Sequence, residues 1–304
     1  MTSVITTNSL TKQYKKKTVV DHLDLNVPAG SIYGFLGPNG AGKSTTLKLL
    51  LGLTKPTKGQ ISILGKEVNL KNRLEILAQT GSLIESPAYY GHLSGKENLQ
   101  IICTLKNVPE KEIDHVLKIV RMEEQQNKKV SHYSLGMKQR LGLAAALLGN
   151  PKVLLLDEPT NGLDPAGIQE MRELICSLPQ KYGMTIIVSS HLLSEIDQMA
   201  THVGIIDKGQ LIFQDSLSAL HEHSRSRILL RTNHDVVAMN VLKQCNIPVE
   251  WQDGTLYLKN HDDELVIKAI SILVKEGIGI LRITEQQKSL EDIFLQFTGK
   301  QVSL

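Results

Sequence analysis

A glycine-rich octapeptide constrains the fold of this chain more than any other feature of its sequence. Residues 37–44 read GPNGAGKS and match the pattern G-x-x-x-x-G-K-[ST]. Glycines at these positions let successive backbone N–H groups turn toward one anion, because no Cβ atom obstructs the curve. The apolar run Ile32–Leu36 precedes the octapeptide and predicts a buried strand, and Thr45–Leu53 has leucines at helical spacing. A strand, a glycine-rich turn and a helix in this order predict a phosphate-binding loop.

The last two residues of the octapeptide indicate a nucleoside triphosphate as the anion. We expect Lys43 to reach the β- and γ-phosphates and the Ser44 hydroxyl to bind Mg²⁺. The helix that begins near Lys43 adds the positive end of its dipole to the same site. Kinases, GTPases and transporter ATPases all use such a loop, so the octapeptide by itself leaves the reaction open.

Two adjacent carboxylates narrow the choice of reaction. The run VLLL at 153–156 predicts a central parallel strand, and Asp157 and Glu158 follow it directly. Ligands of open α/β sheets bind at the carboxyl ends of the strands. We expect Asp157 to hold Mg²⁺, directly or through water, and Glu158 to polarise a water molecule for in-line attack on the γ-phosphate. His191 follows a second apolar run, 185–188, and this position favours a contact with the γ-phosphate.

The composition is typical of a globular chain and excludes several other classes. The 304 residues include 41% apolar and 21% charged residues, and the formal net charge of +3 is too small to predict nucleic-acid binding. No apolar run approaches the roughly 18 residues of a spanning helix, and residues 1–17 lack the apolar segment of a secretory signal. The three widely spaced cysteines form neither a disulfide framework nor a zinc pattern. We therefore expect a soluble, cytoplasmic protein.

The sequence predicts two domains, residues 1–224 and 225–304. The segment HEHSRSR at 221–227 is polar and lacks hydrophobic periodicity, so the junction is placed there. Beyond it, the periodicity follows the order β-α-β-β-α-β and then a helix, which resembles a ferredoxin-like α+β fold. That last helix has apolar residues on one face: Leu290, Ile293, Phe294 and Phe297. In the first domain, a helical stretch is predicted at about 97–124. It has an apolar stripe along one face: Ile113, Val116, Leu117 and Val120.

Taken together, the motifs resemble the nucleotide-binding subunit of ATP-binding cassette (ABC) transporters over residues 4–220. YSLGMKQR at 133–140 stands at the signature position, NGLD at 161–164 stands at the D-loop, and the N-K-x-D element of GTPases is missing. The resemblance implies an α/β P-loop NTPase cassette with a RecA-like core, an antiparallel β subdomain and a helical subdomain at about 86–150. It also implies Mg²⁺-dependent hydrolysis of ATP by two cassettes, as a homodimer, with each ATP clamped between one P-loop and the other signature helix.

The resemblance assigns roles to individual residues. Tyr14 resembles the aromatic residue that stacks on adenine, and Ser134 with Gly136 would bind the γ-phosphate across the dimer. The predicted nucleotide-binding residues are Tyr14, Gly37, Pro38, Asn39, Gly40, Ala41, Gly42, Lys43, Ser44, Thr45, Ser134, Gly136 and Asp164. Leu135 and Met137 replace a glycine and the glutamine of the usual signature, so neither is assigned as a ligand. The predicted catalytic residues are Glu158, His191 and Glu85.

Glu85 stands where the family has the Q-loop glutamine, and an ionised Glu only accepts hydrogen bonds whereas Gln also donates them. Together with YSLGMKQRLG, NGLDPAGI and the 225–304 tail, Glu85 resembles the subgroup that confers resistance or immunity to bacitracin and lantibiotic peptides. This implies a peptide antibiotic as indirect cargo and a separate membrane permease, which holds the subunit at the inner face of the cell membrane and contacts the segment 86–132.

Two other functions stay open at this point. One is a soluble ABC ATPase that acts on ribosomes or nucleic acid. The single cassette and the lack of long heptads disfavour it, and we expect no nucleic-acid partner. The other is a P-loop kinase of small molecules, in which Glu158 would deprotonate an acceptor instead of water.

Overall fold

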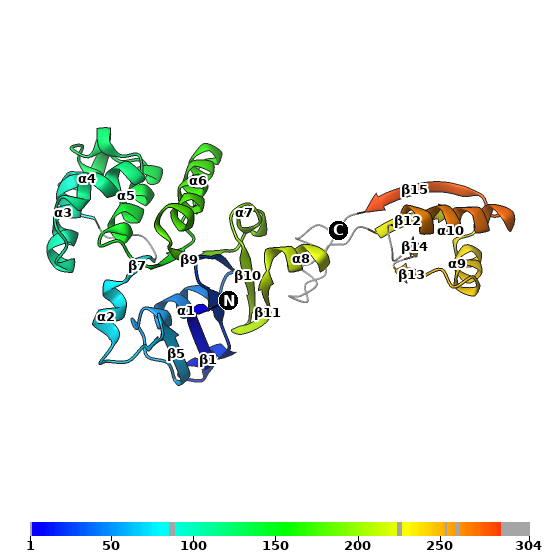
Figure 1. Cartoon of the computed structure of the whole chain (residues 1–304), viewed down its shortest axis with the longest axis horizontal. Coiled ribbons are helices and arrows are strands. Elements are labelled where there is room, and N and C mark those ends of the chain that lie inside the picture. Colours follow the sequence, from blue (N-terminus) through cyan, green and yellow to red (C-terminus); the bar gives the residue numbers. More distant parts are fainter. Residues whose placement is uncertain (1, 85–88, 224–226, 253, 259–261, 287–304) are drawn as a thin grey trace. The chain divides into compact units, whose positions relative to one another are not determined.

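A computed structural model describes residues 2–84, 89–223, 227–252, 254–258 and 262–286 (Figure 1). Its contacts divide the chain into two compact units, Met1–Ser218 and Ala219–Leu304. The sequence predicts the junction at 224/225, in a polar segment, whereas the contacts divide the chain inside helix α8 (Leu217–His223). None of the helices within the described ranges is both long and apolar enough to cross a membrane.

The first unit is built on a six-stranded sheet in the order β11-β10-β4-β9-β8-β7. All neighbouring pairs are parallel except β10 and β11, which form an antiparallel hairpin. The strands are β4 (Ile32–Leu36), β7 (Thr80–Leu83), β8 (Val153–Asp157), β9 (Thr185–Ser190), β10 (His202–Asp207) and β11 (Gln210–Ser216). Every residue of β4 and β9 is buried. Because both faces of these central strands are covered, their sequences are mostly apolar rather than alternating between apolar and polar residues.

The register of the central strands decides where their loops emerge. Leu36 pairs with Ser190, and Asp157 pairs with Ser189. Because β4, β9 and β8 are parallel, the segments that follow them leave the sheet at the same edge. The glycine-rich octapeptide, the Glu158 turn and the His191 loop therefore meet there.

A second, antiparallel sheet packs against the first and shares its core. Its strands are β1 (Ser3–Tyr14), β2 (Lys17–Leu23), β3 (Asn26–Pro28), β5 (Lys58–Ile63) and β6 (Lys66–Glu67). One cluster of buried side chains contains Ile5 and Ile63 of this sheet together with Phe35 and Leu155 of the first. The β1–β2 hairpin turns at residues 15–16, so that Tyr14 lies at the end of β1.

Among the described residues of the first unit, four helices accompany the sheets and three more form a helical subdomain. The first set is α1 (Lys43–Leu50), α2 (Arg73–Ala78), α6 (Pro165–Tyr182) and α7 (Leu193–Asp197). The subdomain contains α3 (Gly95–Lys106), α4 (Glu112–Ile119) and α5 (Leu135–Leu147), with short 3₁₀ turns at Glu123–Gln125 and Val130–His132. The predicted apolar stripe is buried at all four positions: Ile113, Val116, Leu117 and Val120.

The predicted helical stretch at 97–124 is two helices in the structure. α3 begins with a capping box between Ser94 and Glu97. It ends at Asn107, whose left-handed backbone (φ 54°) turns the chain away from the helix axis. Pro109 follows and has no N–H to continue a helical ladder. The helix therefore ends because of local turn residues, which hydrophobic periodicity does not detect.

The second unit has the predicted order β-α-β-β-α-β. Its elements are β12 (Arg227–Thr232), α9 (Asp235–Gln244), β13 (Val249–Gln252), β14 (Thr255–Leu258), α10 (Asp263–Lys275) and β15 (Ile280–Gln286). The sheet runs β13-β14-β12-β15 and is antiparallel throughout, so the ferredoxin-like prediction is confirmed. The predicted last helix, with Leu290, Ile293, Phe294 and Phe297, lies outside the described residues.

The core of the second unit lies between its sheet and the helices α9 and α10. Leu230, Leu256 and Leu273 are fully buried in one cluster. The acidic run at 262–264 caps α10, because Asp262 accepts a hydrogen bond from the Glu264 N–H at 3.2 Å. Within the described ranges, no group of three or more His, Cys, Asp or Glu side chains could hold a metal ion.

The packing of α10 predicts two different outcomes for similar truncations. Leu273→Ala should reduce the free energy of unfolding of this unit by about 2–5 kcal/mol, because the side chain is fully buried. Ile267→Ala, on the same helix but 64% exposed, should change it by about 0.5 kcal/mol or less. Trp251 of β13 is the single tryptophan of the chain, so its fluorescence in urea titrations of the full chain reports on this unit. Equal shifts for the two variants would contradict the described packing.

Candidate active site

The glycine-rich octapeptide connects β4 to α1 by a tight backbone turn. Gly40 and Gly42 have φ values of +81° and +115°, a region that favours glycine. A Cβ atom at Gly42 would lie 2.7 Å from the Val19 carbonyl oxygen, and one at Gly37 would lie 2.4 Å from that of Ile206. Other backbone segments therefore approach the loop so closely that only glycine fits at these two positions.

Lys43 lies inside this loop and is held by groups around it. Its side chain is 5% exposed, and Nζ donates hydrogen bonds to the carbonyl oxygens of Gly37 (2.7 Å) and Pro38 (3.4 Å). Nζ also lies 3.5 Å from Glu158 Oε1. Burial lowers the pKa of Lys43 below its ordinary value, and the carboxylates of Glu158 and Asp157 oppose that shift. The loop thus holds a desolvated ammonium group where the sequence predicts the terminal phosphates.

The N-terminus of α1 fits an anion. Its N-cap residue is Gly42, which has no side chain that could accept a hydrogen bond from the first N–H groups of the helix. The first turn of this fully described helix also contains no acidic residue. Ser44 is exposed in that first turn, and Thr45 is partly exposed beside it. The orphan N–H groups of the turn are consequently available to phosphate oxygens.

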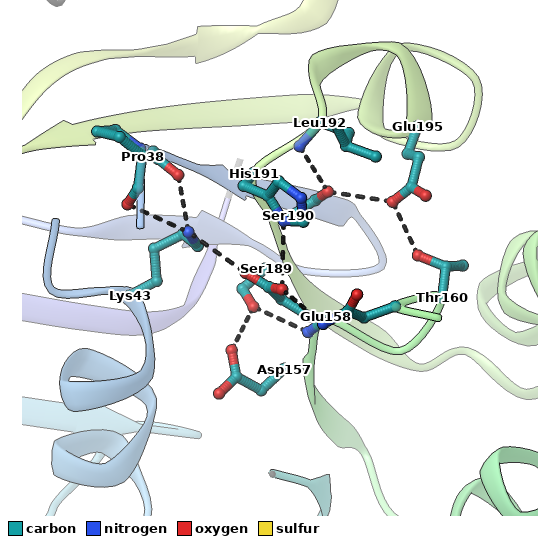
Figure 2. A network of polar contacts seen from close by, with 12 residues as sticks. Pro38, Lys43, Asp157, Glu158, Thr160, Ser189, Ser190, His191, Leu192 and Glu195 are labelled. Atoms are coloured by element: carbon teal, nitrogen blue, oxygen red, sulfur yellow. Dashed lines mark hydrogen bonds and ion pairs between the residues drawn. The ribbon is translucent and has the colours of Figure 1, made fainter. Parts of the chain in front are cut away.

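Glu158 has a strained backbone that Ser189 stabilises (Figure 2). Its φ of +47° is uncommon for a residue with a side chain. The Glu158 N–H donates to the carbonyl oxygen (3.2 Å) and the hydroxyl (3.0 Å) of Ser189. The same hydroxyl donates to Asp157 Oδ1, so Ser189 holds both acidic residues in place.

His191 completes this network from the neighbouring strand end. Its Nδ1 lies 3.2 Å from Glu158 Oε2, and its side chain is about one-third exposed. The structure therefore brings together Lys43, Asp157, Glu158 and His191, the four side chains that the sequence predicts at this edge. A cation, two carboxylates and an imidazole in this arrangement can bind phosphate and accept a proton from water.

The oxygen donors at this edge fit Mg²⁺. Ser44 offers a hydroxyl and Asp157 a carboxylate, which are the hard ligands that this ion prefers. Mg²⁺ commonly takes only one or two protein ligands and completes its octahedron with waters and substrate phosphates. Ser44 and Asp157 are therefore the residues that would hold Mg²⁺ beside a bound nucleotide.

The signature and D-loop residues form a separate cleft. Ser134 caps α5 by accepting from the Met137 N–H (3.2 Å), and Asp164 caps α6 by accepting from the Gly167 N–H (3.0 Å). Of the residues that the structure describes, none in the stretch 37–44 lines this cleft. Ser134, Gly136 and Asp164 are thus not part of the Lys43 network in their own chain.

Leu135 of the signature and Leu163 of the D-loop each lie beside a glycine of the other segment. Leu135 Cδ2 would lie 3.0 Å from a Cβ atom at Gly162, and Leu163 Cδ2 would lie 3.8 Å from one at Gly136. Leu135 is nevertheless about half exposed. The leucine that departs from the usual signature therefore packs partly against the D-loop of its own chain.

The aromatic residue that the sequence predicts to stack on adenine is about half exposed. Tyr14 is 47% exposed, and Lys12 Nζ lies 4.8 Å from the centre of its ring. The lysine is also anchored to the Lys55 carbonyl oxygen at 2.7 Å. Stacking of adenine on Tyr14 stays a prediction. Glu85 lies outside the described residues, and its assignment as a catalytic residue also stays a prediction.

Several polar residues that support the site belong to no motif in the sequence and were not predicted. They are Thr160, Ser189, Ser190 and Glu195. The serines are visible in the run VSSH before His191, but a serine at a strand end has no specific spacing. Glu195 follows His191 by four positions, and this proximity in the sequence is the one local signal that points to it.

Comparison with known proteins decides the family. The sequence profile described as ABC transporter matches residues 20–161. BcrA of Bacillus licheniformis, named a bacitracin transport ATP-binding protein, is 46% identical over 303 residues, which cover 98% of each chain. The chain belongs to the ABC transporter family, as an ATPase subunit. SrtF of Streptococcus pyogenes, named a lantibiotic transport ATP-binding protein, is 43% identical over 73% of this ABC subunit and 96% of its own length.

A solved structure agrees with the fold. A bacterial ABC transporter cassette described as dimeric superposes on the ABC subunit with a TM-score of 0.64 and 25% identity. The match covers 70% of this chain and 98% of the cassette. The predicted fold class, with a P-loop core, an antiparallel sheet and a helical subdomain, is thereby confirmed.

The loop geometry predicts unequal effects of two alanine substitutions. Gly42→Ala should lower the affinity for ATP by more than about tenfold, because the new Cβ would clash with the Val19 carbonyl as well as strain the backbone. Gly40→Ala has nothing within 4 Å of the new Cβ, so it should only destabilise the left-handed backbone of the loop, by about 1–2 kcal/mol, and lower the affinity for ATP less than Gly42→Ala does. Titration with a fluorescent ATP analogue measures both. Equal affinities for the two variants would contradict this geometry.

Proposed function

We propose that this ABC subunit hydrolyses ATP to drive transport of a cell-envelope-active peptide antibiotic, of the bacitracin or lantibiotic class, through a separate membrane permease. The single observation that supports the chemistry is the network of Lys43, Glu158 and His191 at one sheet edge. The cargo class is supported by the bacitracin transport relative, whose alignment includes both units of this chain. The lantibiotic transport relative aligns with a shorter part of the chain, which favours the bacitracin class.

The proposed reaction begins with an exchange of partners by Lys43. Its ammonium leaves the carbonyl oxygens of the loop and pairs with the β- and γ-phosphates, while the N-terminus of α1 and the loop N–H groups bind the same anion. Mg²⁺, held by Ser44 and Asp157, would supply further neutralisation of the phosphate charge. Tyr14 would stack its ring on adenine. Glu85 would accept hydrogen bonds near the γ-phosphate.

The bond-breaking step is assigned to Glu158 and His191. The Glu158 carboxylate accepts a proton from a water molecule while the water oxygen attacks the γ-phosphorus in line. The bond between the γ-phosphorus and the bridging oxygen breaks, and ADP leaves with the bonding electron pair. His191 contacts the γ-phosphate from the neighbouring loop and holds it against movement. ATP and water are thereby converted to ADP and phosphate.

A second copy of the chain completes each site in this proposal. Ser134, Gly136 and Asp164 lie outside the Lys43 network of their own chain, and they are at or next to helix N-termini. A helix N-terminus binds anions, so the signature of one copy suits the γ-phosphate held by the P-loop of the other. ATP binding then favours a closed homodimer and hydrolysis favours its opening, which supplies the two-state movement that a transporter needs.

An apolar groove offers a docking surface for the permease. Its volume is about 720 Å³, and it is lined by residues between Leu51 and Ile84 together with parts of α3 and α5. Leu74 and Leu105 on its rim are 81% and 80% exposed. Exposed apolar side chains gathered around one groove are typical of a protein-binding surface. We propose that a short amphipathic helix of the permease binds here, so that the subunit works at the inner face of the membrane.

The Glu158 assignment predicts a separation of binding from turnover. Glu158→Gln should retain ATP affinity within about threefold and lower kcat by about a hundredfold or more, because the amide no longer accepts a proton from water. Size-exclusion chromatography with ATP and Mg²⁺ should reveal a trapped dimer of this variant. Persistent turnover in the variant would remove Glu158 from its proposed role, and absence of nucleotide binding by the unmodified chain would contradict the proposed function as a whole.

The groove predicts a defect in assembly that leaves nucleotide binding intact. Leu105→Asp should abolish co-purification with the permease that we propose as partner, since a charge in the groove must lose its hydration on docking. Leu70→Asp is a matched control, because Leu70 is also 80% exposed but does not line the groove. Equal recovery of the permease with both variants would contradict docking at this surface.

The cargo class is tested in cells. Deletion of the subunit should sensitise its host to bacitracin-like or lantibiotic peptides, and the unmodified gene but not the Glu158→Gln variant should restore resistance. Unchanged susceptibility to a panel of both peptide classes would contradict the proposed cargo, even if ATP hydrolysis by the purified chain is established.

A further inference from the structure

One carboxylate oxygen joins the two loops that contain the proposed catalytic residues. Oε2 of Glu195, on α7, accepts hydrogen bonds from the hydroxyls of Thr160 (2.8 Å) and Ser190 (3.1 Å). Figure 2 displays these bonds as a bridge between the segment after Glu158 and the segment before His191. Glu195 and Thr160 are 35 positions apart in the sequence, so the bridge exists only in the folded chain.

Both donors of this bridge are buried. Thr160 and Ser190 are each 3% exposed. A buried hydroxyl without an acceptor costs free energy, and an ionised acceptor forms a stronger hydrogen bond than a neutral one. The two hydroxyls therefore depend on Glu195, and Glu195 restricts both of them to one position.

The bridge lies close to Glu158 along the chain. Thr160 is two residues after Glu158, and the Asn161 N–H closes the intervening turn on the Glu158 carbonyl oxygen at 3.1 Å. The strained backbone of Glu158 is thus held on one side by Ser189 and on the other by the turn that Thr160 anchors. Strained residues persist where the surrounding structure over-determines their conformation.

The bridge also lies close to His191. Ser190 precedes His191 directly, and its hydroxyl accepts a hydrogen bond from the Leu192 N–H at 3.0 Å while donating to Glu195. This pair of bonds turns the chain around His191. The spacing between His191 Nδ1 and Glu158 Oε2 consequently depends on how Glu195 holds the two loops relative to each other.

We propose that Glu195 is a positioning residue for ATP hydrolysis, which fixes the Glu158 turn and the His191 loop relative to each other through Thr160 and Ser190. The inference rests on the proposed roles of Glu158 and His191. Glu195 acts as a hydrogen-bond acceptor and not as a base, because its bridging oxygen is directed at two hydroxyls of the protein. A glutamine at this position can therefore replace it, whereas an alanine cannot.

The first test compares three variants of the full chain. Glu195→Ala should lower kcat by about tenfold and change the KM for ATP by less than about twofold, because the P-loop is untouched. Glu195→Gln should retain at least about a third of kcat, since its amide oxygen still accepts from both hydroxyls. Ser194→Ala, an exposed neighbour on α7, is the matched control and should behave as the unmodified chain. A loss of kcat in Glu195→Gln equal to that in Glu195→Ala would overturn the proposal.

A second test separates positioning from mere support of α7. Thr160→Val removes one donor without changing α7 and should also lower kcat at nearly constant KM. The double variant Thr160→Val with Glu195→Ala should be no slower than Glu195→Ala alone, because both changes break the same bridge. The proposal would be overturned if the fold-loss of kcat in the double variant equalled the product of the losses in the two single variants. Full activity in Thr160→Val would also overturn it. Failure of the unmodified chain to hydrolyse ATP would instead contradict the proposed function, so the two failures are distinguishable.

Discussion

The parallel register of β4, β9 and β8 is the constraint on which the candidate active site depends. Leu36 pairs with Ser190 and Asp157 pairs with Ser189, so the segments after these strands leave the sheet at one edge. The three segments are far apart in the sequence, and no contact along the chain would bring them together. A shift of register would separate Lys43 from Glu158 without changing a residue of either motif.

At this edge the charged groups of the protein stabilise one another. The buried ammonium of Lys43 has loop carbonyls and a carboxylate as partners, and the backbone of Glu158 is held by Ser189. Phosphate oxygens would thus replace existing partners of Lys43 rather than satisfy an unpaired charge. Groups that are held in place before the reaction need little reorganisation during it, which is the main source of electrostatic catalysis.

Much of the fold was predictable because its signals are local. The glycine octapeptide, the apolar strands and the stripe on α4 depend on residues that are neighbours in the sequence, and so does the β-α-β-β-α-β order of the second unit. The division of the helical stretch at Asn107 and Pro109 was also encoded locally, in turn chemistry rather than in hydrophobic periodicity. The position of the domain division was less predictable, since it follows from contacts and not from composition.

The sequence by itself determined which side chains are available for phosphate chemistry, because Lys43, Asp157, Glu158 and His191 stand next to strand-end signals. Only the tertiary structure decided that Thr160, Ser190 and Glu195 meet. It also decided that the signature residues lie in a cleft apart from the P-loop. The reason is physical: a motif is a property of a continuous segment, whereas a hydrogen bond between distant residues exists only after strand register and helix packing have placed both ends.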